Sequence, residues 1–160
     1  MSSDIDNAGA TRTSTGAIGT IEFGPTATVC RGIRGATTAP ANTAEDIIEV
    51  THEMMRALIV LNDLRSEDVV SAIFTTTQDL TATFPALAAR EIGWLEVPLM
   101  CSHEMNVPGA LQKCVRVMLH VNTTRSAAQI KHVYLKGAGQ LRPEWAYSDV
   151  QIRELIGPDR

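Results

Sequence analysis

The sequence predicts an α+β domain in which helices cover one face of a mixed β-sheet. First, residues 114–121 alternate between apolar and other side chains, which is typical of a half-buried strand. Second, residues 43–62 place apolar side chains at helical spacing behind a capping signal. Third, the patterns follow in the order strand, helix, strand, helix, strand, strand, helix, which is an α+β layout.

Length and charge limit the class of protein. The 160 residues suit one domain with a core of ordinary size. A net charge of -4, with no basic stripe, argues against nucleic acid or an anionic membrane as a partner. No apolar run approaches membrane-spanning length, and the start lacks the pattern of a secretory signal. We therefore expect a cytoplasmic protein.

The cysteines and histidines give no sign of a metal or a disulfide framework. The three cysteines (Cys30, Cys101 and Cys114) are odd in number and lack CxxC spacing, which is typical of free thiols in a reducing compartment. The histidines show no zinc-ligand spacing; they are His52, His103, His120 and His132. Since no catalytic triad or nucleotide-binding loop is present either, we expect no cofactor.

The chain begins with a polar segment and a short strand. Residues 1–28 are mostly small or polar and have too few apolar side chains to offset the entropy of ordering them, so we expect a flexible extension. A strand is predicted from Val29 to Arg34, with Gly35 ending it.

Two helices and a buried strand follow. Thr43, with Asp46 at capping-box distance, predicts the start of the first helix, which ends near Asn62. Its apolar stripe predicts a face turned to the core; the members are Ile47, Val50, Met54, Leu58 and Leu61. Residues 69–77 read as a buried strand. After a polar loop at residues 78–83, Pro85 suits the first turn of a short helix that ends at Gly93.

The central segment predicts two neighbouring strands, at residues 97–101 and 114–121, joined by a loop at residues 107–109. This arrangement places Glu104 near the end of one strand and Arg116 inside the next. Because a buried arginine needs a partner, one interpretation is that the two residues pair to cap the sheet. A functional role for the same pair is the other interpretation.

The last part of the chain predicts one more helix and a tail. Ser126 with Gln129 marks the helix start, and the helix is expected to end near Gly137 or Gly139. This divides the chain into an extension (1–28), a domain (29–143) and a tail (144–160), whose docking the pattern leaves open. Apolar residues on the second face of the sheet indicate an oligomer.

Four arginines lie where strands, helices or their ends converge, namely Arg34, Arg90, Arg116 and Arg142. Guanidinium groups match carboxylates through two parallel hydrogen bonds. Several of them facing one cleft indicate a small polyanion, most simply a dicarboxylate. Taken singly, Arg34, Arg90 and Arg142 also fit solvated surface arginines.

Four separated runs carry a family resemblance. They are CRGIRGATT (30–38), LTATFPALAARE (80–91), VPLMCSHEMNVPGALQKCVRVMLHVNT (97–123) and IKHVYLKGAGQLRP (130–143). In one register over residues 29–143, they resemble the monofunctional, trimeric, mixed α/β class of chorismate mutase. The resemblance implies a homotrimer packed as a pseudo-α/β-barrel with active sites between subunits. It also implies the Claisen rearrangement of chorismate, a dicarboxylate, to prephenate for phenylalanine and tyrosine synthesis.

The resemblance also implies roles for individual residues. Arg116 matches the cation that faces the ether oxygen, and Glu104 matches the acceptor of the ring hydroxyl. Cys101 matches a residue near that hydroxyl, although a small buried strand residue is an alternative interpretation. The remaining matches concern binding: Arg34, Tyr134 and Arg142 for the carboxylates, Phe84 for an apolar wall, Arg90 for the cleft and Leu141 for its mouth.

The sequence departs from the family pattern at two positions. Leu87 replaces a lysine that usually lies beside the cleft, and Met100 replaces a small hydroxyl residue. Losing a positive charge at Leu87 weakens capture of a carboxylate without touching the bond-breaking step. We therefore expect a raised Michaelis constant with turnover largely kept.

Three other interpretations fit part of the pattern. A trimeric imine or enamine deaminase has a similar architecture but must activate water. A trimer that binds a dicarboxylate without turnover would keep Arg34 and Arg142 yet have no need for Arg116 opposite Glu104. His103 and His132 could serve as general acids, but the rearrangement needs none, so surface or supporting roles fit them better.

Overall fold

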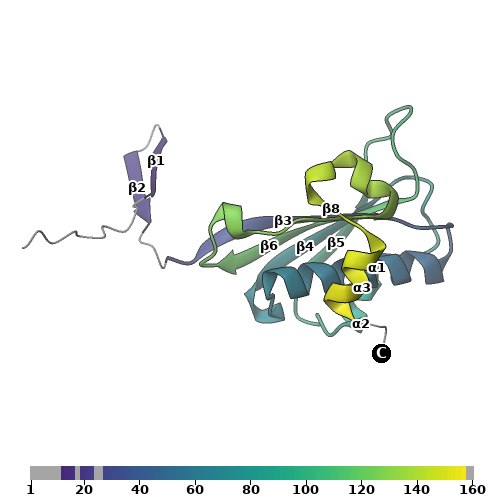
Figure 1. The fold of residues 1–160 in the computed structure, drawn as a ribbon, viewed down its shortest axis with the longest axis horizontal. Coiled ribbons are helices and arrows are strands. Elements are labelled where there is room, and N and C mark those ends of the chain that lie inside the picture. Colours follow the sequence, from purple (N-terminus) through teal and green to yellow (C-terminus); the bar gives the residue numbers. More distant parts are fainter. Residues whose placement is uncertain (1–11, 17–18, 24–26, 158–160) are drawn as a thin grey trace, which may run out of the picture.

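The computed structural model describes residues 12–16, 19–23 and 27–157. Within these residues it contains a two-stranded sheet, a six-stranded mixed sheet, three α-helices and four 3-10 helices (Figure 1). The strands are β1 (Arg12–Gly16), β2 (Gly19–Phe23), β3 (Val29–Thr38), β4 (Val69–Thr76), β5 (Leu99–His103), β6 (Cys114–Thr123), β7 (Val133–Leu135) and β8 (Ala146–Tyr147). The helices are α1 (Ala44–Asn62), α2 (Ala86–Glu91) and α3 (Asp149–Ile156), with 3-10 helices η1 (Ser66–Asp68), η2 (Ala127–Gln129), η3 (Lys136–Leu141) and η4 (Pro143–Trp145).

The N-terminal extension contains an antiparallel hairpin. β1 pairs with β2 in a register that runs from Arg12–Phe23 to Gly16–Gly19. Composition alone gave no indication of this hairpin. Residues 1–11, 17–18 and 24–26 lie outside the described part of the chain, so the flexibility expected for residues 1–28 stays a prediction.

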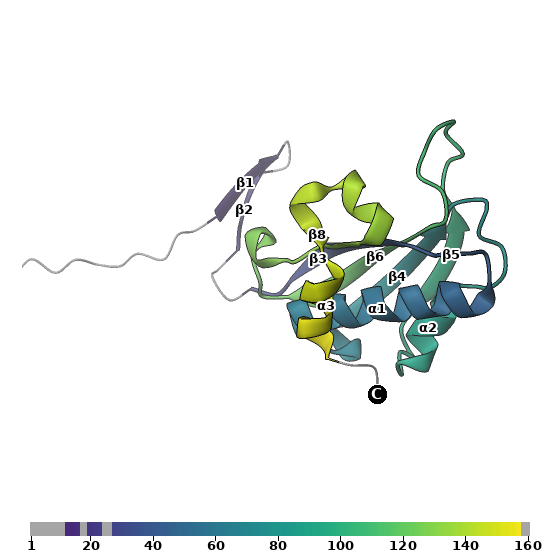
Figure 2. The same cartoon turned by 45° about the vertical axis from the view of Figure 1, so that its right-hand side comes forward.

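The six-stranded sheet has the order β5-β4-β6-β3-β7-β8. β6 is antiparallel to β3 and β4, while β4–β5, β3–β7 and β7–β8 are parallel pairs. The three α-helices lie on one side of the sheet, and residues 136–145 cross the other side (Figures 1 and 2). We call these sides the covered face and the open face. The α+β class with helices over one face is confirmed.

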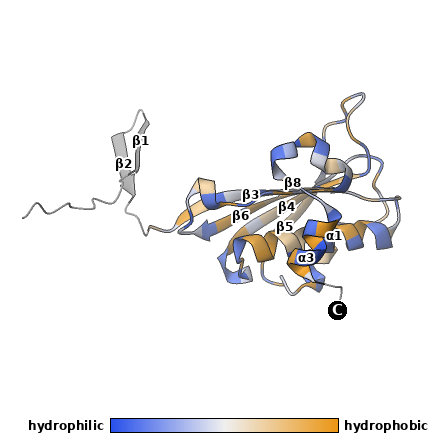
Figure 3. Cartoon of the chain, in the orientation of Figure 1, coloured by the Kyte–Doolittle hydropathy of each residue, from blue (hydrophilic) through white to orange (hydrophobic). Residues whose placement is uncertain are grey.

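The core lies between α1 and the covered face. Ile33 of β3, Phe74 of β4 and Leu119 of β6 have no exposed surface, and Met54 and Leu58 of α1 pack against them. The alternation predicted for residues 114–121 is confirmed, because its inward-facing members are all buried: Val115, Val117, Leu119 and Val121. Figure 3 shows the matching pattern on α1, where hydrophobic and hydrophilic residues alternate along the helix.

Helix α1 begins where the capping signal predicts. Thr43 has an extended backbone, and its hydroxyl oxygen accepts the N–H of Asp46 at 3.1 Å. The same hydroxyl donates to Asp46 Oδ2 at 2.8 Å. These bonds satisfy one of the free N–H groups at the helix start and fix the entry of the chain, although the Asp46 side chain binds the Thr43 hydroxyl and not the backbone N–H that a capping box would use.

Strand β3 runs past Gly35, so the prediction that this glycine ends the strand is wrong. Pairing with β6 continues to Thr38 opposite Cys114. A Cβ atom at Gly35 would lie 2.8 Å from Leu58 Cδ1 and 2.9 Å from Val117 Cγ1. The glycine therefore allows α1 to approach the sheet closely, which is a packing requirement and not a turn.

Strands β5 and β6 are not neighbours, contrary to the prediction. β4 lies between them, antiparallel to β6 and parallel to β5. The strand predicted at residues 97–101 also begins and ends two residues later, as Leu99–His103. The loop of residues 104–113, which connects β5 to β6, projects beyond the end of the sheet (Figure 2). A loop signal fixes a change of direction but not the strand with which the chain pairs next.

The helix predicted after Ser126 is wrong beyond its first turn. The capping box is present, with the Ser126 N–H donating to Gln129 Oε1 at 2.8 Å, but only the 3-10 helix η2 follows. Residues 133–135 then form β7, in which Val133 pairs in parallel with Gly35. All three residues of β7 are buried, because α1 covers one face and residues 136–145 cover the other. Burial on both faces favours a strand of continuous apolar residues.

The C-terminal tail docks on the domain. Ile152 of α3 is 1% exposed and belongs to the main core, and Arg56 Nη2 of α1 donates to Ile156 O at 3.0 Å. Ser148 caps α3 by accepting the N–H of Gln151 at 3.3 Å. The tail is thus a third helix on the covered face.

Among the described residues, no helix is both long enough and apolar enough to cross a membrane.

Candidate active site

An arginine and a glutamate meet on the open face, across the end of β4. Arg116 of β6 lies opposite Thr75 of β4, which in turn lies opposite Ser102 of β5. Glu104 follows β5, where its backbone N–H donates to Thr76 O at 2.8 Å. Its Oε2 accepts a hydrogen bond from Arg116 Nη1 at 3.0 Å, and its Oε1 accepts one from the Thr75 hydroxyl. The predicted Arg116–Glu104 pair is therefore present, although the two strands are not adjacent.

Arg34 lies on the same face, one diagonal step from Arg116. In the β3–β6 register, Arg34 is opposite Met118 and Ala36 is opposite Arg116. The Nε atoms of both arginines are buried and have no hydrogen-bond partner within the described residues. Because an unsatisfied buried donor costs about 1–3 kcal/mol, two such donors on the same face indicate a place for an anion.

Arg116 stays charged despite its partial burial. Burial by itself lowers the pKa of the guanidinium, but Cys114 and Glu104 beside it raise the pKa above its ordinary value. Burial raises the pKa of the Cys114 thiol, while Arg116 beside it partly opposes this effect. The open face thus presents a permanent cation held by one carboxylate.

His132 fixes the backbone at Arg34. The Arg34 N–H donates to His132 Nδ1 at 3.0 Å, which requires a free lone pair on that nitrogen. Burial, together with the charges of Arg142 and Arg34, lowers the pKa of His132. His132 is therefore a neutral acceptor, in keeping with the supporting role expected from the sequence.

Residues 141–145 fold over this part of the sheet. Tyr134 is 4% exposed, and its ring centroid lies 5.7 Å from that of Trp145. Arg142 stacks on Trp145, with its guanidinium carbon 3.8 Å from the ring centroid, and its Nε donates to Glu144 Oε1 at 2.7 Å. Leu141, at the end of η3, is 37% exposed. Three predicted binding residues, Tyr134, Leu141 and Arg142, thus lie at one end of the open face.

Cys101 lies on the other face of the sheet. Its register partner on β4 is Phe74, whose side chain is in the core. Cys101 packs against that core, and burial raises the pKa of its thiol, while the Ala86 backbone at the start of α2 lowers it. Within one chain the structure does not bring Cys101 together with Arg116. All three cysteines are free thiols, as predicted.

Phe84 and Arg90 belong to the same region as Cys101, around α2. Phe84 precedes the helix and is 69% exposed. Arg90 Nη1 donates to the carbonyl oxygens of Trp94, at 2.9 Å, and Leu95, so it is tied to the loop that leads to β5. Leu87, on α2, is exposed. The predicted site residues thus form two groups: an open-face group (Arg34, Glu104, Arg116, Tyr134, Leu141 and Arg142) and an α2-edge group (Phe84, Arg90 and Cys101).

Sequence reasoning missed two residues that contact the open-face group. Thr75 lies in a run of three threonines inside a buried strand, and nothing in the run marks one hydroxyl as special. Trp145 lies beyond the predicted domain boundary at residue 143, yet it contacts Tyr134, His132 and Arg142. The proline at 143, taken as the point where the chain leaves the domain, instead begins the 3-10 helix η4.

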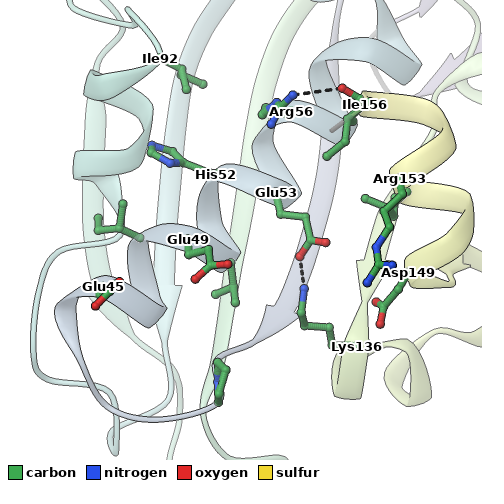
Figure 4. Close-up of a pocket in the computed structure, with 15 residues that line it drawn as sticks. Glu45, Glu49, His52, Glu53, Arg56, Ile92, Lys136, Asp149, Arg153 and Ile156 are labelled. Atoms are coloured by element: carbon green, nitrogen blue, oxygen red, sulfur yellow. Dashed lines mark hydrogen bonds and ion pairs between the residues drawn. The ribbon is translucent and has the colours of Figure 1, made fainter. Parts of the chain in front are cut away.

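A groove of about 1020 Å³ lies on the covered side, between α1 and α3 (Figure 4). Its lining carries both signs of charge, and Glu53 forms an ion pair with Lys136 across it. Burial lowers the pKa of Lys136, and nearby Asp149 partly opposes this effect. None of the predicted site residues lines the groove.

Comparison with known proteins identifies a family. The family described as chorismate mutase type I matches residues 30–145. The chain is 47% identical over 115 residues to chorismate mutase AroH of Bacillus subtilis, covering 71% of this chain and 91% of that protein. It is 44% identical over 115 residues to chorismate mutase AroH of Thermus thermophilus, covering 71% and 94%. A solved chorismate mutase structure from Clostridium thermocellum superposes with a TM-score of 0.68 at 50% identity, covering 69% of this chain and 98% of that one.

Proposed function

The chain belongs to the chorismate mutase type I family, and we propose that it converts chorismate to prephenate by electrostatic stabilisation and conformational restriction. The observation that carries the mechanism is the Arg116–Glu104 pair on the open face. The pair uses one guanidinium N–H, and the buried Nε of Arg116 has no hydrogen-bond partner among the described residues. The family is that of an isomerase of aromatic amino acid biosynthesis, so the product feeds phenylalanine and tyrosine synthesis.

The rearrangement moves electrons within one molecule. As the ether C–O bond breaks ahead of C–C bond formation, negative charge grows on the ether oxygen. A fixed cation directed at that oxygen binds the transition state more tightly than the substrate. Arg116 fits this role because its charge is permanent and Glu104 holds its guanidinium in place. No proton transfer and no covalent intermediate is needed.

The other open-face residues suit binding of the substrate. The buried Nε of Arg34 provides a donor for a carboxylate, and Glu104 has unused lone pairs for the ring hydroxyl. Arg142 and Tyr134 lie beside Trp145 at the same end of the sheet, where a second carboxylate would be bound. Holding both carboxylates selects the compact conformer of the substrate, which lowers the entropic part of the barrier.

The proposed assembly is a homotrimer with active sites between subunits. The α2-edge group and the open-face group lie on opposite faces in one chain, so a single chain does not enclose a site that uses both. The open face also has apolar side chains that none of the three α-helices in the described residues covers: Met100 is 57% exposed, and Ile73 and Met118 are partly exposed. Placing the α2 edge of one subunit against the open face of the next would cover these residues and complete the site.

The proposed reaction also determines which cofactors and partners the protein needs. The reaction needs no cofactor, and its partners are the dicarboxylate substrate and the other two subunits, with no nucleic acid or membrane. We place the enzyme in the cytoplasm, where its free thiols stay reduced. The family match leaves the deaminase alternative without support.

The test is loss of chorismate absorbance with the purified protein, with acid conversion of prephenate as confirmation. Saturable loss of chorismate that disappears in Arg116→Ala supports the proposal. A folded trimer that binds a dicarboxylate without turnover would instead favour a binding module.

A further inference from the structure

The Thr75 hydroxyl and Arg116 bind different oxygen atoms of the Glu104 carboxylate. Thr75 donates to Oε1, and Arg116 Nη1 donates to Oε2 at 3.0 Å. Thr75 lies between Arg116 and Ser102 in the register of three adjacent strands, so the sheet fixes its position. The next residue of the same strand holds the Glu104 backbone, because the Glu104 N–H donates to Thr76 O at 2.8 Å.

Because Thr75 binds one carboxylate oxygen, Arg116 and Glu104 share fewer hydrogen bonds than such a pair can form. A guanidinium and a carboxylate that meet freely favour two parallel hydrogen bonds. Here they share only one, because the second carboxylate oxygen is bound by Thr75. The Nε of Arg116 keeps its N–H unused and buried, with no partner in the described part of the chain. A donor in that state is ready for an acceptor on the substrate.

We propose that Thr75 is a positioning residue for the reaction at Arg116. By binding Oε1 of Glu104, it keeps the Arg116–Glu104 contact to a single hydrogen bond and leaves the other guanidinium N–H groups for the ether oxygen. Without the hydroxyl, Oε1 accepts a second, parallel N–H from Nη2 of Arg116, and this turns the guanidinium toward Glu104 and away from the substrate. The inference rests on the proposed function, in which Arg116 faces the ether oxygen.

Kinetics of Thr75→Val test this role. Valine keeps the branched shape and suits a strand, so the fold is expected to persist. We expect kcat to fall about tenfold to a hundredfold, the range for a hydrogen bond to a charged group. KM should change less than about threefold, because the withdrawn donor acts in the transition state. Thr75→Ser keeps the hydroxyl and should restore kcat to within about threefold of the wild type.

Ser71→Ala is the matched control. Ser71 lies on the same face of the same strand, and its hydroxyl is 3.0 Å from His120 Nδ1, away from Glu104. This variant should keep the wild-type kcat. An unchanged kcat in Thr75→Val, or a kcat in Thr75→Ser as low as in Thr75→Val, would overturn the inference.

A crystal structure of the Thr75→Val trimer gives a readout that does not depend on turnover. We expect Arg116 and Glu104 to form two parallel hydrogen bonds in place of one. A single bond that stays as in the wild type would contradict the role of Thr75. If the wild-type enzyme fails to convert chorismate, the proposed function fails, while the structure still decides whether Thr75 controls the pair.

Discussion

The two faces of the sheet are built from the same strands, but the covered face forms the core and the open face carries the candidate active site. On the covered face, Ile33, Phe74 and Val117 are 0–1% exposed and pack against helices. Their sequence neighbours Arg34, Thr75 and Arg116 point to the open face, where they remain partly exposed. The open face holds hydrogen-bonded charges, together with two buried arginine donors that have no partner among the described residues. Such groups stabilise a fold poorly but suit a transition state. Changes on one face should therefore affect stability, and changes on the other should affect catalysis.

The largest effect is expected on the open face, from Arg116→Ala. Loss of the cation opposite the ether oxygen should raise the barrier by at least ~3–4 kcal/mol, or about 10²–10³-fold in kcat. The melting temperature should change little, because the covered face is untouched. Steady-state kinetics and thermal unfolding of the same preparation check both points. Arg65→Ala, which removes a surface arginine paired with Glu67 and Asp68, is the charge-matched control and should keep full activity.

On the covered face we expect a loss of stability in place of a loss of activity, and Gly35→Ala tests this. The new Cβ would lie 2.8 Å from Leu58 Cδ1, so α1 must shift, and we expect a loss of about 1–3 kcal/mol in the free energy of unfolding. Gly32→Ala is the control on the same strand, since its Cβ would meet only Met118 Sδ, at 3.4 Å. Chemical denaturation of both variants decides the comparison. Equal stability of the two would contradict the close packing assigned to Gly35.

A smaller effect is expected at the α2 edge, from Leu87→Lys. The substituted residue is 45% exposed, and a lysine there adds a positive charge beside the proposed cleft. We expect KM to fall by about twofold to tenfold at low salt with kcat unchanged, because the charge acts on capture of the substrate. Raising the ionic strength should reduce the difference. Binding no tighter than the wild type at low salt would refute this role.

The smallest effect is expected from pH. Arg116 has a pKa raised above its ordinary value, so kcat should stay flat between about pH 6 and 9. The pKa of His132 in the folded chain lies below its ordinary 6.5, so as the pH falls the unfolded chain binds a proton at this residue before the folded chain does. Stability should therefore fall as the pH drops below 6.5, and less so in His132→Asn. A rise or fall of kcat with pH close to the ordinary pKa of histidine would contradict the mechanism, because it would indicate a proton transfer.

The sequence predicted those parts of the fold that depend on local chemistry. The cap at Thr43 is confirmed, because it depends on a hydrogen bond between residues three apart in the sequence. The alternation from Val115 to Val121 is confirmed, because side-chain spacing decides which face of a strand is buried. The order of strands was not predictable in the same way. The loop at residues 107–109 indicates a reversal, but the pairing of β4 between β5 and β6 is set by contacts distant in sequence.

The site was predictable to a different extent. The family was correctly identified from four separated runs, and the pairing of Arg116 with Glu104 follows from the cost of burying an arginine. The contacts of Thr75 and Trp145 depend on register and on a turn past residue 143, which no spacing in the sequence reveals. The individual roles of the site residues remain predictions.

In the proposed trimer, each active site combines the open face of one subunit with the α2 edge of another. To test this, Arg116→Ala and Arg90→Ala subunits, each of which we expect to be inactive alone, are co-expressed and the activity of the mixed trimers is measured. Random mixing should recover about a quarter of the wild-type activity, because half of the open faces and half of the α2 edges are intact. Mixed trimers that are no more active than the separate variants would contradict a site built between subunits.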